Sequence, residues 1–322
     1  MTDISGARVL VVGGLGFIGG HLTRRLARDG ARLTVVTPSR ARHIDDVGEL
    51  EAGGVRVVEA DVRDRAAMIA QVERQHVVVN LAGQSGAVRS MDDPWTDLDV
   101  NCGGALSLLD ALRAVNRTAK VVFTGSRLEY GRAGSTAVAE SDGGDPLCIH
   151  AIHKITVEQY LKLYERLFGI RYVVARLTNP YGPGQPRSRT AYGVVNRMIH
   201  LALGGDALPI FGDGCQRRDY IYIDDAIDAL VALMTNAAAA GVYNVGTGIG
   251  TPIVEMAHAI ASIAGSGRIE HCAWPPLAEQ IETGDFVADV SRIRRDVGWQ
   301  ARVTLDAGLR QTVAHYRANV TS

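Results

Sequence analysis

The chain has few cysteines and no long hydrophobic run. Its four cysteines, at positions 102, 148, 215 and 272, include no Cys-x-x-Cys pair. This scattered set predicts reduced thiols in a cytoplasm and not a disulfide framework. The N-terminus lacks a charged region followed by a hydrophobic segment, and no apolar stretch has the length of a bilayer span. We therefore expect neither a signal peptide nor a membrane anchor.

Excess charge of either sign is also missing. The formal net charge of the 322 residues is −1, and 47% of them are hydrophobic. A chain without a basic cluster is not expected to bind nucleic acid or an anionic membrane surface. Lysine occurs only at Lys120, Lys154 and Lys162. Because the chain otherwise uses arginine as its cation, a lysine at a potential site is notable.

Short apolar runs alternate with helical patterns through the first half of the chain. This order predicts an α/β fold with a Rossmann-type, doubly wound parallel sheet. After about residue 180 the alternation loosens and glycine and proline become frequent. We expect a dinucleotide-binding domain over residues 1–180 and a smaller substrate-binding region over residues 181–322, partly intertwined with it. The strands are expected at 8–12, 32–37, 56–59, 77–81, 120–124 and 172–177, and the main helices at 19–29, 65–74, 97–115, 151–168, 191–203, 223–236, 253–265 and 290–297.

A glycine motif lies between the first expected strand and the first expected helix. In Gly13-x-x-Gly16-x-x-Gly19 the first glycine permits a tight turn and the second lets the backbone approach a pyrophosphate. The third lets the helix pack on the strand, and the helix N-terminus then faces the phosphates. In this strand–turn–helix context the motif predicts a dinucleotide site.

Further motifs recur along nearly the whole chain. With the glycine loop they resemble the NAD-dependent sugar-nucleotide epimerase/dehydratase family of the extended short-chain dehydrogenase/reductases. The segments that carry the resemblance are Asn80-Leu81-Ala82-Gly83, Thr124-Gly125-Ser126, Tyr130-Gly131, Lys154, Asn179-Pro180-Tyr181-Gly182-Pro183, Gln216-Arg217-Arg218-Asp219 and Tyr243-Asn244-Val245-Gly246.

The resemblance implies NAD as cofactor, with NADP as the alternative. Thr37 stands where an acidic residue usually accepts the ribose hydroxyls. Ser39, Arg40 and Arg42 are either ligands for a 2′-phosphate or residues of a solvated loop. The cofactor-binding residues implied by the resemblance are Gly13, Gly16, Phe17, Ile18, Thr37, Arg40, Asp61, Val62, Leu81, Ala82, Lys154 and Pro180.

One catalytic position departs from the family. Relatives carry Tyr-x-x-x-Lys, whereas this chain has His150-x-x-x-Lys154. A free imidazole has a pKa of about 6.5, and a neighbouring cation lowers it. Beside Lys154, His150 is therefore expected to be neutral at pH 7 and able to accept a proton. The resemblance implies a catalytic set of Ser126, His150 and Lys154; the alternative is that position 150 has lost or changed its role.

The substrate end departs from the family at two further places. Sequences of 4,6-dehydratases carry an acidic pair after the position of Ser126, but here Arg127-Leu128 follows, which argues against 4,6-dehydration. Glu282-Thr283-Gly284-Asp285 replaces a segment that supplies an arginine to phosphate. Arg218 is expected to clamp a phosphate, or else to pair with Asp224 or Asp225. The substrate-binding residues implied by the resemblance are Gln84, Ser126, Asn179, Arg218 and Tyr243.

The helices expected at 97–115 and 151–168 carry more apolar residues than one core-facing stripe needs. In similar proteins this pair of helices forms a dimer interface, so the resemblance implies a homodimer; the alternative is that the residues belong to the core. They are Leu106, Leu109, Leu112, Ile152, Ile155 and Leu163. Cys148, His150 and His153 lack a grouped carboxylate in the sequence, and we expect no metal site.

Three functions are compatible with these motifs. The first is an NAD(P)-dependent epimerase or oxidoreductase that acts on a nucleotide-diphosphate sugar through a transient keto intermediate. The second is different chemistry on the same scaffold, such as an altered reductase, a dehydratase or an enzyme that modifies a non-sugar natural product. The third is a non-catalytic protein that binds a dinucleotide.

Overall fold

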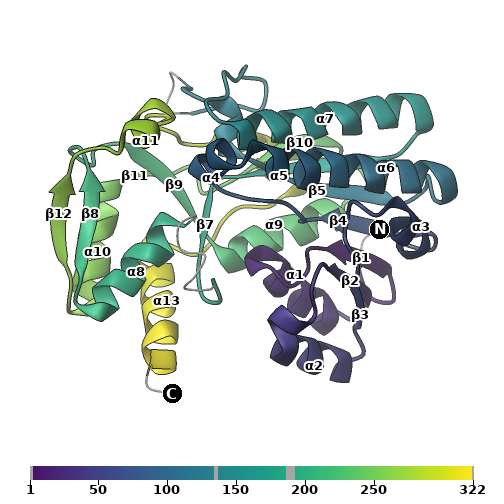
Figure 1. Cartoon of the computed structure of the whole chain (residues 1–322), viewed down its shortest axis with the longest axis horizontal. Helices are drawn as coiled ribbons and strands as arrows, with labels where there is room; N and C mark the ends of the chain where they lie inside the picture. Colours follow the sequence, from purple (N-terminus) through teal and green to yellow (C-terminus); the bar gives the residue numbers. More distant parts are fainter. Residues whose placement is uncertain (1–2, 134–136, 186–192, 321–322) are drawn as a thin grey trace.

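The main sheet has seven strands, all parallel. The computed structural model describes residues 3–133, 137–185 and 193–320. The strand order is β10-β6-β5-β4-β1-β2-β3. This doubly wound order confirms the expected fold class (Figure 1). The strands are β1 (Arg8–Val12), β2 (Arg32–Thr37), β3 (Arg56–Glu59), β4 (Val77–Asn80), β5 (Lys120–Ser126), β6 (Tyr172–Leu177) and β10 (Gly241–Val245).

Helices cover both faces of this sheet, as Figure 1 shows. Side chains alternate along β1, so that Val9 and Val11 join one apolar cluster while Leu10 and Val12 join the other. Burial on both sides explains why the strand is continuously hydrophobic. One face is covered by α1 (Phe17–Arg28), α2 (Ile44–Ala52) and α9 (Ile223–Thr235), and the other by α3 (Arg65–Val72), α6 (Gly104–Val115) and α7 (Ile149–Phe168).

The helix expected over residues 97–115 is interrupted. The chain forms α4 (Ala87–Asp92) and α5 (Pro94–Asp97), then a π-helical segment η2 (Leu98–Gly103), and only then α6. Within η2 the buried side chain of Asn101 donates to Asp97 Oδ1 at 2.8 Å and to the Gln84 carbonyl at 3.1 Å. These bonds tie the segment to the loop after β4. Irregular turns of this kind are frequent at functional sites.

A smaller region lies beside the carboxyl ends of the main strands. It has a three-stranded sheet, β11-β9-β7, and a parallel pair, β12-β8. The first two residues of the helix expected at 191–203 lie outside the described residues. The elements are β7 (Asn179–Tyr181), α8 (Val194–Gly204), β8 (Ala207–Phe211), β9 (Arg217–Tyr222), β11 (Gly250–Pro252), α10 (Ile253–Ala264), β12 (Arg268–Cys272), α11 (Pro276–Gln280), α12 (Ser291–Val297) and α13 (Leu305–Val320).

Of the six apolar residues singled out on α6 and α7, two are buried, three are exposed and Ile155 is half-buried. Leu109 and Leu112 are buried, with 2% and 0% exposure, and belong to the core. Leu106, Ile152 and Leu163 are exposed by 40%, 43% and 39%. The two helices pack side by side. No helix in the described part of the chain is both long and apolar enough to cross a membrane.

Candidate active site

A cavity of about 850 Å³ extends from the glycine loop to the smaller region. It opens beside the β1–β4 pair, where the strand order reverses and where doubly wound sheets bind their ligands. A second cavity of about 300 Å³ continues it toward the ends of β2 and β3, and the two share Gly13, Gly16, Leu81 and Gly83. This combined space suits a dinucleotide followed by a second ligand.

The glycine loop has the geometry that the sequence predicts. Gly13 has φ of +82°, a left-handed conformation that favours glycine. A Cβ at Gly19 would lie 2.2 Å from the Gly13 carbonyl oxygen, so only glycine lets α1 approach the turn. A Cβ at Gly16 would meet only that oxygen, at 3.5 Å, and Gly16 lines both cavities. Its backbone is therefore open to a phosphate at the N-terminus of α1.

Eleven of the twelve expected cofactor residues line the two cavities. Thr37, Asp61, Val62 and Ala82 line the smaller one, at the adenosine end of the expected dinucleotide. The larger cavity is lined by Gly13, Gly16, Phe17, Ile18, Leu81, Lys154 and Pro180.

Arg40 is the exception among the cofactor residues. Its guanidinium makes two hydrogen bonds of 2.8 Å to Glu51 and one of 2.6 Å to the Val57 carbonyl. Arg42 and His43 line the cavity in its place. The sequence reasoning missed this exchange because the carboxylate that holds Arg40 comes from α2, a helix that it did not predict. Asp61 is held by Arg63, whose hydrogen bonds lower the pKa of the carboxyl.

His150 lies in the first turn of α7 and lines the larger cavity, 5% exposed. Its Nδ1 is buried and lies 3.6 Å from Asp97 Oδ2. Burial lowers the pKa of His150 below its ordinary value, the Lys154 cation adds to this, and Asp97 opposes it. A pKa lowered in this way favours the neutral imidazole at pH 7, and burial, not Lys154, is the main cause.

Asp97 is a residue of this site that the sequence reasoning missed. Its carboxylate is fully buried and lies 2.6 Å from His153 Nδ1. Burial opposes ionisation of Asp97, but its contacts with His150, His153 and Asn101 outweigh burial and lower its pKa. The result is an ionised carboxylate beneath His150. No local signal marks the pair, because the two residues are far apart in the sequence and meet only where the end of α5 packs on α7.

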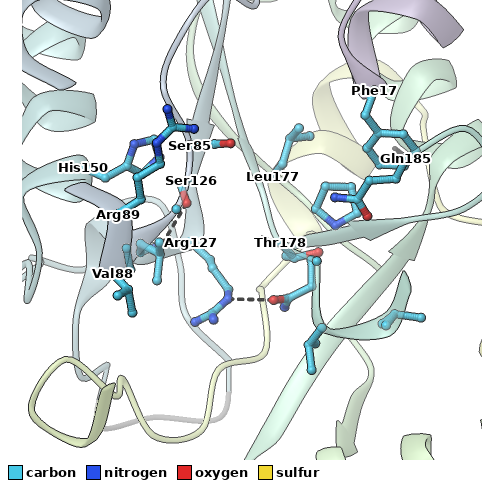
Figure 2. Close-up of a pocket in the computed structure, with 18 of the residues that line it drawn as sticks. Phe17, Ser85, Val88, Arg89, Ser126, Arg127, His150, Leu177, Thr178 and Gln185 are labelled. Atoms are coloured by element: carbon cyan, nitrogen blue, oxygen red, sulfur yellow. Dashed lines mark hydrogen bonds between the residues drawn. The ribbon is translucent and has the colours of Figure 1, made fainter. Parts of the chain in front are cut away.

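Lys154 and Ser126 are both fixed by the protein. The buried Lys154 Nζ donates to the Thr124 carbonyl at 2.9 Å and lies 4.5 Å from the centroid of the Phe123 ring. Burial lowers its pKa. Ser126 Oγ accepts from the backbone N–H of Leu128 at 3.2 Å, and its hydroxyl hydrogen can still point to a ligand. Figure 2 shows His150 and Ser126 on the same side of the cavity.

A buried charge cluster supports Ser126 from behind. The backbone N–H of Ser126 donates to Glu129 at 2.5 Å, and Arg176 bridges Glu129, at 3.2 Å, and Glu158, at 2.7 Å. Burial and the neighbouring Glu158 raise the pKa of Glu129 well above its ordinary value. Two carboxyl groups thus share one guanidinium. Sequence reasoning did not identify this cluster.

The expected substrate residues fall into two groups. Gln84, Ser126, Asn179 and Arg218 line the larger cavity. Tyr243 lies outside both cavities: it is buried on β10, 4.6 Å beneath the guanidinium of Arg292. Strand β10 is at the edge of the main sheet next to α12, which explains the different location.

Arg218 is 3% exposed and pairs with Glu282. It also donates to the carbonyl of Gly284. The alternative that it pairs with Asp224 or Asp225 is wrong, because Asp225 accepts from the backbone at residues 302 and 303 and neither acid contacts Arg218 among the described ion pairs. Residues 282–285, which stand where relatives supply a phosphate-binding arginine, therefore contact Arg218 through Glu282 and Gly284.

The chain is similar to known proteins along most of its length. Residues 9–246 match the NAD dependent epimerase/dehydratase family. The UDP-glucose 4-epimerase of Mycolicibacterium smegmatis is 33% identical over 317 residues, which cover 96% of this chain and 98% of the relative. The UDP-glucose 4-epimerase of Thermus thermophilus in complex with NAD superimposes with a TM-score of 0.84 at 29% identity, over 96% of this chain and 99% of that one. The UDP-glucose 4-epimerase of Thermotoga maritima with UDP-glucose superimposes with a TM-score of 0.86 at 27% identity, over 97% of this chain and 99% of that one.

The chain belongs to the NAD-dependent epimerase/dehydratase family. Membership confirms three expectations drawn from the motifs: the family, an enzyme of epimerase type and NAD as its cofactor. The open Gly16, the N-terminus of α1 and the cavity beside Asp61 fit that cofactor.

Proposed function

We propose that this enzyme epimerises a nucleotide-diphosphate sugar through a transient keto intermediate, with His150 as the base. The observation that carries the proposal is the pairing of His150 with the buried Asp97 carboxylate at the wall of the larger cavity. The chain also retains the other two catalytic residues of the family pattern, a hydroxyl at Ser126 and a lysine at Lys154. The lysine is notable because the chain otherwise uses arginine. The relatives named for UDP-glucose 4-epimerase supply the substrate class.

The cofactor would be held by backbone at Gly13 and Gly16 and by side chains at Thr37, Asp61 and Lys154. When bound, NAD would supply the acceptor for a hydride from the sugar carbon and the source of its return. No acid stands at position 37, and Arg42 is the cation of the following loop that lines the adenosine end. Arg40 is not part of this argument, since Glu51 holds it.

His150 takes the proton of the sugar hydroxyl as the carbinol becomes a ketone. Asp97, next to Nδ1, favours the tautomer with its proton on that nitrogen, which leaves Nε2 to accept. The same carboxylate stabilises the imidazolium until the proton returns to the epimerised sugar. Ser126 donates a hydrogen bond to the reacting oxygen, and the Lys154 cation opposes lasting protonation of the ring.

The substrate extends from this point toward the smaller region. Asn179 and Arg218 meet its diphosphate, and Gln84 lines the wall beside the reacting sugar. After oxidation the keto sugar must turn its other face to the cofactor, and a cavity of about 850 Å³ gives it room. Arg127-Leu128 supplies no acid for elimination of water, which disfavours 4,6-dehydration as the alternative chemistry.

The test uses the purified enzyme with NAD and UDP-glucose, UDP-galactose and their N-acetylamino analogues. We expect at least one pair to interconvert at a catalytic rate, with a transient rise in absorbance at the reduced-nicotinamide band. A rise without an epimer would favour an altered oxidoreductase. Binding of NAD with neither signal for any nucleotide sugar would contradict the proposal and favour a non-catalytic protein.

We also propose a homodimer in the cytoplasm. The cysteines are free, and helices α4 to α7, which contact one another, carry exposed apolar side chains that we treat together as one patch. A pair of such helix faces can bury the patch around a twofold axis. The patch consists of Val88, Met91, Trp95, Leu98, Leu106, Ile152, Leu163 and Leu167.

Replacing Ile152 and Leu163 together by lysine tests the dimer. Two buried charges at the interface should convert a dimer of 34.4 kDa chains into monomers in sedimentation velocity. Ile44→Lys is the matched control, because Ile44 is 71% exposed on α2, on the opposite side of the sheet. Monomers in the unaltered protein at micromolar concentration would contradict the proposed dimer.

A further inference from the structure

Arg127 begins the short helix η3 (Arg127–Tyr130) and lines the larger cavity directly after Ser126. Figure 2 shows its side chain reaching from the Ser126 side of the cavity toward the segment that carries Thr178. The cofactor loop lies elsewhere in this cavity, at Gly13 and Gly16. Arg127 therefore faces the space that a second ligand, and not the dinucleotide, would fill.

The hydrogen-bond partners of Arg127 are neutral. Its Nε donates to Asn179 Oδ1 at 3.0 Å and one terminal nitrogen donates to Thr283 Oγ1 at 2.9 Å. No acidic side chain among the described residues forms an ion pair with it, whereas the adjacent Arg218 pairs with Glu282. A guanidinium has five N–H donors. Three of them thus find no acceptor within the described protein.

The charges around Arg127 do not balance. The cluster contains two guanidinium groups, of Arg127 and Arg218, and one carboxylate, of Glu282. Burial lowers the pKa of Arg127 to about 9, and the neighbouring Arg218 adds to this effect. The group still carries its charge at neutral pH. A partly buried cation without a counter-ion is costly, and an anionic ligand removes that cost.

We propose that Arg127 is a specificity-determining residue that binds an anionic group of the substrate, in addition to the phosphate that meets Arg218. The inference rests on the proposed function, because it takes the ligand to be a nucleotide-diphosphate sugar. Two groups have the required chemistry. One is a carboxylate on the sugar, which the position next to Ser126 favours; the other is the distal phosphate, which the contact with Asn179 favours.

Arg127 is not equivalent to the acid of dehydratases, and it does not occupy the position of the missing phosphate arginine. It stands where dehydratases carry an acid, so the charge at this position is reversed. An acid there would repel an anionic sugar, whereas a forked cation holds it by two parallel hydrogen bonds. The reversal thus changes which substrates the cavity tolerates and not only how tightly it binds them.

The experiment measures binding of three ligands to the NAD-loaded enzyme by titration calorimetry. The ligands are UDP, UDP-glucose and UDP-glucuronic acid, and the variants are Arg127→Gln, Arg127→Lys and Arg32→Gln. Arg32 begins β2, is exposed, and provides the same loss of charge far from the cavity. Arg127→Lys keeps the charge without the fork, so it should lose less affinity than Arg127→Gln. Melting temperatures verify that each variant is folded.

If the sugar carboxylate is the partner, Arg127→Gln weakens UDP-glucuronic acid roughly 10- to 100-fold and leaves the other two ligands within about twofold. If the distal phosphate is the partner, all three weaken by the same factor. Unchanged binding of all three in folded Arg127→Gln would overturn the inference while leaving the proposed function intact. Failure of the unaltered enzyme to bind any of them would instead overturn both.

Discussion

The cofactor end and the reaction end of the cavity differ in how far their residues depart from those of similar sequences. At the cofactor end, Gly13, Gly16 and Gly19 form the expected turn, and the backbone supplies the phosphate site. At the reaction end, His150, Arg127 and Glu282 each replace a different residue type of similar sequences. Backbone sites depend on conformation, which glycine spacing encodes. Side-chain sites depend on chemistry, which a single substitution can alter while the scaffold is kept.

The largest expected effect lies at the reaction end. His150→Ala removes the base and should lower turnover by roughly 10²- to 10⁴-fold. NAD affinity, measured by fluorescence titration, should change by less than about threefold, because His150 is not among the groups that hold the cofactor. His150→Gln is the matched control: it keeps a hydrogen-bonding side chain without a base and should lose as much. Retained turnover in His150→Ala would remove this residue from the mechanism.

A smaller effect, on NAD affinity and not on the chemical step, is expected at the cofactor end. Gly16→Ala adds a methyl group that meets protein only at 3.5 Å, so the fold should be kept. The methyl group projects toward the expected pyrophosphate and should weaken NAD about tenfold or more, roughly 1.4 kcal/mol. Gly19→Ala, whose Cβ would lie 2.2 Å from the Gly13 oxygen, should instead lower the melting temperature. Equal NAD affinity in Gly16→Ala would show that the loop does not approach the cofactor.

A third, smaller effect concerns the support of the base. Asp97→Asn keeps the size of the side chain and removes the charge next to His150 Nδ1. Turnover should fall about tenfold, or roughly 1.4 kcal/mol, because a carboxylate 3.6 Å from Nδ1 stabilises the imidazolium by its charge. KM for the sugar nucleotide should stay within about twofold, because Asp97 is fully buried and touches no substrate. Loss of the fold, seen by circular dichroism, would instead give Asp97 a structural role only.

Much of the fold was predictable, since buried parallel strands are continuously apolar. Four of the six expected strands match β1, β2, β3 and β6 residue for residue. The errors have physical causes. The Gly103-Gly104 pair and the bonds of Asn101 interrupt an otherwise helical pattern, and helix α2 was missed because its apolar stripe is only Val47 and Leu50 on an acidic segment.

The site was predictable where a motif is contiguous and not where it depends on packing. Gly13 to Gly19, Ser126 and Lys154 were found because their spacing is local. Asp97 and Arg127 were not assigned roles. Asp97 meets His150 only because α5 packs on α7. Arg127 lacks an acidic partner among the described residues because Glu282, 155 positions later, pairs with Arg218. Tyr243 was expected at the substrate site but lies outside both cavities, because β10 is at the edge of the main sheet.

The central claim is that a neutral, buried imidazole is the base. The most direct test is the pH dependence of kcat/KM for the unaltered enzyme and for Asp97→Asn. Since burial lowers the pKa of His150, activity should rise with pH through a midpoint below 6.5 and then stay level through neutral pH. Asp97 raises that pKa, so Asp97→Asn should move the midpoint to still lower pH. A midpoint above pH 8, or one that is unchanged in Asp97→Asn, would contradict the account.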